Sequence, residues 1–111
     1  MDLYELYSQV MDFTLKLRNY NSFDDDLYNK IFRQLKILFK EWETAEFIPK
    51  SAFVSCLLLL DMLAGGSRFW SDEVCIKAED AVIALHELIA DIETGEIAEF
   101  ARRYFEERNI N

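Results

Sequence analysis

Residues that break helices are scarce in this chain, whose 111 residues include one proline and three glycines. This scarcity argues against a disordered chain and against a turn-rich β-sandwich. Hydrophobic residues, in contrast, make up 51% of the chain. A chain of this length buries roughly 65% of its unfolded surface when it folds, which is enough for a real core. We therefore predict a single compact all-α domain over residues 1–111.

Long apolar segments are also missing. The longest apolar run, residues 52–60, contains Ser55, ends before Asp61 and is too short to span a bilayer. The first dozen residues hold three acids and lack the basic and apolar regions of a secretory signal. Both cysteines, Cys56 and Cys75, lie in apolar stretches, so we expect them to be reduced. The chain is therefore expected to be cytoplasmic and to bind no membrane.

Residues that carry chemistry are few. His86 is the one histidine, and Ala90 stands where the zinc motif HExxH requires a second histidine. Position 83 is Ile83, whereas a helical di-carboxylate metal site requires glutamate three residues before the histidine. No glycine-rich phosphate loop or Asp-rich calcium loop is present. We therefore expect no metal, no cofactor and no enzymatic activity, and we interpret His86 as a partly exposed helix residue.

Apolar residues recur at helical spacing in five segments, which predicts a helix bundle. Ser22 and Ser71 are candidate N-caps, because each precedes acidic residues that favour a helix N-terminus. Gly65 and Gly66 are suited to end the third segment. Thr94 interrupts the helical pattern before the fifth segment. The third segment is apolar nearly all round, which is typical of a central helix. The predicted helices span residues 2–19, 23–42, 50–64, 72–92 and 96–108.

Basic residues are outnumbered and unevenly spread. The chain has 12 Lys and Arg against 21 Asp and Glu, a net charge of −9. Because phosphate binding requires Lys and Arg, this balance argues against nucleic acid as the partner. Residues 72–99 hold nine acids and one lysine, so a net charge of −8 falls on the fourth helix and the start of the fifth. Four of the acids form one stripe at helical spacing: Glu73, Asp80, Glu87 and Asp91.

An apolar line runs beside this acidic stripe. Ile76, Ile83 and Ala90 are seven residues apart and point away from the predicted core. Their other side is flanked by Glu79, with Asp72 and His86 along the same row. An apolar line within an acidic rim is typical of a protein-binding surface. The alternative is that the fourth helix is sandwiched and buries Ile76 and Ile83 against another helix.

A loop before the acidic helix contains two aromatic residues, Phe69 and Trp70. Exposed aromatic side chains are frequent anchors of protein interfaces, so either residue is a candidate contact. The alternative is that they fold back over the edge of the core.

In size, acidity, helical content and lack of catalytic motifs, the chain resembles the immunity proteins of bacterial contact-dependent growth inhibition systems. The resemblance covers the whole chain in general character and includes no signature motif. It implies an inhibitor that neutralises a cationic toxin domain, often an RNase or DNase, and that is monomeric within the complex. The alternative is a helical adaptor or regulator, such as an anti-sigma factor or a secretion chaperone, that binds a partner helix in an apolar groove.

Overall fold

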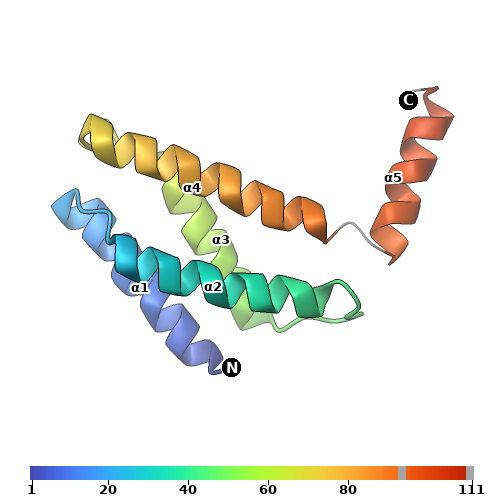
Figure 1. Cartoon of the computed structure of the whole chain (residues 1–111), viewed down its shortest axis with the longest axis horizontal. Helices are drawn as coiled ribbons and strands as arrows, with labels where there is room; N and C mark the ends of the chain where they lie inside the picture. Colours follow the sequence, from blue (N-terminus) through green and yellow to red (C-terminus); the bar gives the residue numbers. More distant parts are fainter. Residues whose placement is uncertain (93–94, 110–111) are drawn as a thin grey trace.

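The computed structural model describes residues 1–92 and 95–109. Over these residues it contains five helices and no strand, which confirms the predicted all-α fold. Figure 1 shows α1 and α2 side by side, α3 crossing between them and α4, and α5 beyond the end of α4. The helices are α1 (Leu3–Tyr20), α2 (Asp25–Trp42), α3 (Lys50–Gly65), α4 (Asp72–Asp91) and α5 (Gly95–Glu107). The predicted break at Thr94, like the acid Glu93, lies outside the described residues.

Local sequence signals account for most helix ends. Asp2 and Ser71 cap α1 and α4, because their side-chain oxygens accept backbone N–H groups of the first turn. At α2 the predicted cap, Ser22, is wrong, since the carboxylate of Asp24 accepts the N–H of Leu27 at 3.0 Å. Asn21 ends α1 in the left-handed conformation, with φ of 48°, which asparagine tolerates better than most residues. Short connections therefore follow α1 and precede α4.

The core lies between the first four helices, which pack as a bundle. α1 packs against α2 and α3, and α4 packs against α3 and α2. The largest fully buried side chains come from α1, α2 and α3, and α4 adds smaller ones with Leu85. Fully buried residues include Leu6, Val10, Phe13, Leu17, Ile31, Leu35 and Leu59. Burial of this apolar surface is the main stabilising contribution to the bundle.

α3 is central in that it packs against both α1 and α4, but it is not buried on all sides. Its buried face consists of Ala52, Ser55, Leu59 and Leu63, which pack against the bundle. Its opposite face carries larger apolar side chains that are 37–47% exposed, namely Phe53, Val54, Leu57 and Leu58. We call these four residues the α3 outer face. No helix over residues 1–92 or 95–109 combines the length and apolar character that crossing a membrane requires.

α5 forms at the predicted place but stays outside the core. None of its residues is buried, and it leads away from the other helices (Figure 1). Its large apolar side chains are 47–58% exposed, namely Ile97, Phe100, Tyr104 and Phe105. Together with Ala101 they form one side of the helix, which we call the α5 apolar face. The bundle therefore consists of α1–α4, with α5 attached to its end.

Candidate protein-binding surface

The outer side of α4 presents isoleucines to solvent. Ile76 is 58% exposed and Ile83 is 57% exposed, so the alternative that another helix buries them is wrong. The core-facing side of the same helix carries Val74 and Leu85, with Ala78 and Ala81 between them. A helix with a second apolar line on its solvent side gains nothing from that line in the folded monomer, since the side chains remain in water. The line is therefore available to a partner.

Exposed carboxylates surround these isoleucines. We call the combined set the acidic α4 surface: Glu73, Ile76, Glu79, Asp80, Ile83, Glu87 and Asp91. All seven side chains are exposed. The single turn of spacing between neighbouring members keeps them on one strip of the helix. His86 is also exposed and lies along the Glu79 side of the strip.

α4 contains one lysine, Lys77, and its ammonium forms an ion pair with a carboxylate of α2. The ammonium of Lys77 lies 2.8 Å from the carboxylate of Asp25 and 3.4 Å from that of Glu73. The hydrogen bond to Asp25, followed by the attraction of the nearby carboxylates, raises the pKa of Lys77. In the part of the chain that the structure describes, the other four acids of the acidic α4 surface form no ion pair. Their charge is therefore directed at solvent.

The second half of the strip is unfavourable for the helix itself. Glu87 and Asp91 are four residues apart, so their like charges repel each other across one turn. Asp91 is also the last residue of α4, where the helix dipole favours cations and the final turn holds no basic residue. The folded chain therefore gains no stability from these two carboxylates.

The two loop aromatics have different environments. Phe69 is 78% exposed and lies against the guanidinium of Arg68, 5.0 Å from the ring centre. Trp70 is only 8% exposed and belongs to the core, so its predicted availability as an interface anchor is wrong. Its indole N–H is buried and finds no hydrogen-bond acceptor among the described residues. Phe69 thus remains a candidate contact, and Trp70 is a structural residue that closes the bundle next to the start of α4.

Potential metal ligands and thiols are scattered over the described residues. No group of three or more metal-binding side chains forms over residues 1–92 and 95–109. Cys56 and Cys75 are free thiols and half-buried. Burial raises the pKa of the Cys56 thiol to about 11, so it is protonated near neutral pH and is a poor nucleophile.

Two further apolar surfaces were not predicted from the sequence. The α3 outer face is not predicted by the sequence pattern, because a helix that is apolar all round is usually buried on every side. The available signal was the size of the residues: small ones, Ala52 and Ser55, lie on one side, and Phe53 and Leu57 lie on the other. The apolar periodicity of α5 was recognised, but that pattern does not reveal whether the same chain covers it.

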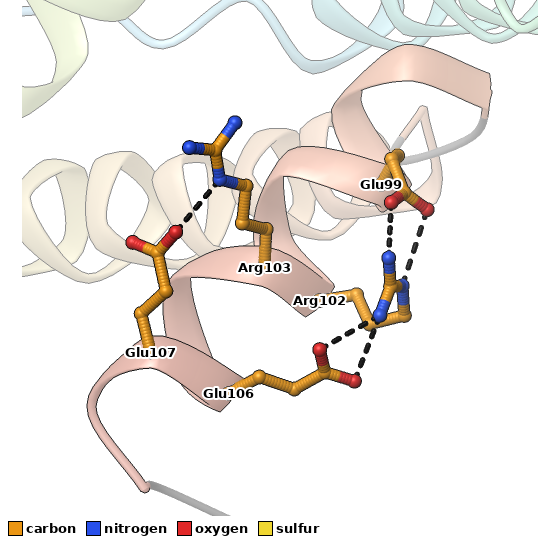
Figure 2. Close-up of polar contacts among 5 residues, drawn as sticks. All are labelled: Glu99, Arg102, Arg103, Glu106 and Glu107. Atoms are coloured by element: carbon orange, nitrogen blue, oxygen red, sulfur yellow. Dashed lines mark hydrogen bonds and ion pairs between the residues drawn. The ribbon is translucent and has the colours of Figure 1, made fainter.

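The polar side of α5 stabilises the helix without help from the bundle. Figure 2 shows Arg102 between Glu99 and Glu106, and Arg103 beside Glu107. The Arg102 guanidinium lies 2.8 Å from the carboxylate of Glu106, and Arg103 Nε lies 2.7 Å from that of Glu107. Such pairs, three or four residues apart, support an isolated helix. These ion pairs thus support the helical conformation of α5 while its apolar side remains exposed to solvent.

Comparisons of this chain with known protein families, curated proteins and solved structures found no match.

Proposed function

We propose that this protein is an immunity protein of the kind found in contact-dependent growth inhibition, acting in the cytoplasm by binding a cationic toxin domain. The observation that carries the proposal is the acidic α4 surface, in which exposed Ile76 and Ile83 lie among five carboxylates, four of which form no ion pair with the described residues. A nuclease is the toxin class that fits best, because its substrate cleft is basic. The inhibitor acts by occupying the substrate cleft of the toxin, and this inhibition requires no catalysis by the inhibitor.

The chemistry of inhibition follows from charge and shape. A nuclease cleft holds Lys and Arg where substrate phosphates bind, and carboxylates at helical spacing supply anionic oxygens at the same places. The opposite charges also accelerate encounter and select the orientation of approach. Ile76 and Ile83 then form the dry centre of the interface, where burial of apolar area contributes affinity. One inhibitor chain binds one toxin domain in this arrangement.

The proposal is tested by reversing charges on α4. The variant Asp80→Lys with Glu87→Lys changes the net charge from −9 to −5, and Asp12→Lys with Glu41→Lys makes the same change on exposed positions of α1 and α2. We expect the α4 variant to bind the toxin domain encoded by the neighbouring gene about a hundredfold more weakly, because like charges then face each other. The control variant should bind much more tightly than the α4 variant.

Cell protection provides the second readout of this experiment. Cells that produce the α4 variant should be killed by the toxin domain, whereas cells with the α1/α2 control should survive. Circular dichroism of both variants checks that the helices are intact. Equal affinity and equal protection for the two variants would show that the acidic α4 surface is the wrong face.

A second candidate function is a helical adaptor or regulator that binds a partner helix. The observation that favours it is the α3 outer face, whose large apolar side chains lack a surrounding rim of acids. An amphipathic partner helix would pack there through apolar contacts spaced three or four residues apart. Such a complex should respond little to ionic strength, whereas the toxin complex should associate more slowly as salt rises.

A further inference from the structure

The chain leaves more surface exposed than a protein of its size normally does. Its accessible surface is 7800 Å², about 1,400 Å² more than the average of about 6,400 Å² for a monomer of 13.1 kDa. Its radius of gyration is 16.0 Å, against about 13 Å for a compact domain of this length. A standard protein interface covers about 800 Å² on each partner. The excess is therefore large enough for a stable interface, and it includes the α3 outer face and the α5 apolar face.

The two helices share one residue pattern over five positions. Each has a pair of adjacent residues, a second pair one turn later and a charged residue after one more turn. The α5 members each follow the α3 members by 47 positions in the sequence. The two sets are Phe53, Val54, Leu57, Leu58 and Asp61 on α3, and Phe100, Ala101, Tyr104, Phe105 and Arg108 on α5. Apolar stripes of this spacing can pack against each other in either direction, so the direction depends on the charged residues.

The charged ends decide the direction of packing. In parallel orientation Arg108 faces Asp61, whereas in antiparallel orientation Arg108 approaches Lys50 at the start of α3. Asp61 is exposed and forms no ion pair within the described part of the chain. Arg108 lies over the ring of Tyr104, 3.9 Å from its centre, and so is on the same side as the α5 apolar face. Charge complementarity thus favours parallel packing of α5 on α3.

We propose that the partner of both faces is a second copy of this chain, in a dimer in which α5 of each copy packs in parallel on the α3 outer face of the other. α5 lies beyond the end of α4 (Figure 1) and none of its residues is buried, so its own chain leaves the α5 apolar face uncovered. Two reciprocal contacts of this type close with two-fold symmetry and leave no free face for further growth. The proposed dimer differs from the monomer that the sequence leads us to expect.

The dimer does not depend on the proposed function. The acidic α4 surface lies outside both exchanged faces, so each copy keeps its own surface and the ratio of one toxin domain per chain is preserved. Failure of the toxin experiment would leave the dimer untouched, and failure of the dimer would leave the acidic α4 surface untouched. The two proposals are therefore separable by measurement.

Sedimentation equilibrium of the full chain tests the dimer. We expect a mass twice the 13.1 kDa of the chain. Leu57→Glu on α3 and Phe100→Glu on α5 should each raise the dimer dissociation constant by about a hundredfold, because each places a charge within both contacts. The matched control is Ile37→Glu on α2, since Ile37 is 54% exposed and lies on neither face. This control should remain dimeric.

Mixing and charge exchange identify which faces meet. An equimolar mixture of the Leu57→Glu and Phe100→Glu chains should form a heterodimer more tightly than either variant pairs with itself, because one of its two contacts is intact. Asp61→Arg and Arg108→Asp should each weaken the dimer, and the chain with both changes should regain it. A wild-type chain that stays monomeric overturns the proposal, and this includes a compact monomer in which α5 folds onto its own α3. A dimer unaffected by Leu57→Glu overturns it as well.

Discussion

Side chains that are close in sequence have different roles, one in the core and one on the surface. Ile83 and Leu85 are two residues apart on α4, yet Leu85 is 4% exposed and Ile83 is 57% exposed. Leu85 contributes to stability through burial, whereas Ile83 is available only to a partner. The same division separates Trp70 from Phe69, which are adjacent in sequence.

Trp70 provides a test of the structural half of this division. We expect Trp70→Ala to lower the free energy of unfolding by about 3–5 kcal/mol, because it removes a large ring from the core. Trp70→Phe should cost much less, since the ring remains and the indole N–H that is lost makes no hydrogen bond. Urea denaturation of the two variants measures the difference. Equal losses would mean that the indole N–H has a partner in solution.

Among the elements, the α1–α2 junction carries an ion pair that responds to acid. Lys16 Nζ donates to the Asp24 carboxylate at 2.7 Å, and this bond, with the N–H of Leu27, lowers the pKa of Asp24. A carboxyl whose pKa is lower in the folded state stabilises that state above its unfolded pKa of about 4. This stabilisation is lost as the pH falls through the folded pKa.

The substitution Asp24→Asn isolates that contribution, because the amide oxygen still caps α2 whereas the charge is gone. We expect the variant to be less stable than the wild-type chain at pH 7. The difference should shrink as the pH falls below about 4, where Asp24 of the unfolded chain becomes protonated, and vanish below the lowered pKa of the folded chain. Urea midpoints measured across this pH range give the result. A difference that is the same at pH 7 and at low pH would refute the role of the ion pair.

The contact between α1 and α3 depends on small side chains of α3. Ser55 is fully buried, and its hydroxyl donates to the carbonyl of Ser51 in the same helix at 2.9 Å. We expect Ser55→Leu to destabilise the bundle by about 1–3 kcal/mol, because the added atoms push the helices apart. Ser55→Ala serves as the control and should cost less than about 1 kcal/mol. Equal stability of the two variants would show that α3 is loosely packed.

Local patterns predicted the helices better than they predicted the helix contacts. Caps such as Ser71 and a break such as Gly65–Gly66 act within a few residues, so they can be read from the sequence. The position of α3 depends on which neighbours it meets, and its all-round apolar pattern is compatible with a central or a peripheral place. The acidic α4 surface was predictable because its charges share one helix. Its exposure, however, is set by the absence of a neighbouring helix on that side.

At the scale of the whole molecule, negative charge is unevenly distributed. A net charge of −8 falls on residues 72–99, and the α3 outer face lies elsewhere on the bundle. A field concentrated on one side steers a cationic partner toward that side, and this steering weakens as salt screens it. Apolar contacts are much less sensitive to salt. The two kinds of surface are therefore suited to different partners: a basic toxin domain on α4, and a second copy on α3 and α5.

The dependence of the association rate on ionic strength tests the role of the acidic α4 surface most directly. Stopped-flow mixing with the toxin domain should give a wild-type rate that falls about tenfold or more from low to high salt. The Asp80→Lys, Glu87→Lys variant should associate slowly and lose most of this dependence, whereas the Asp12→Lys, Glu41→Lys control, with equal net charge, should largely retain it. The same salt dependence in all three proteins would contradict steering by the acidic α4 surface.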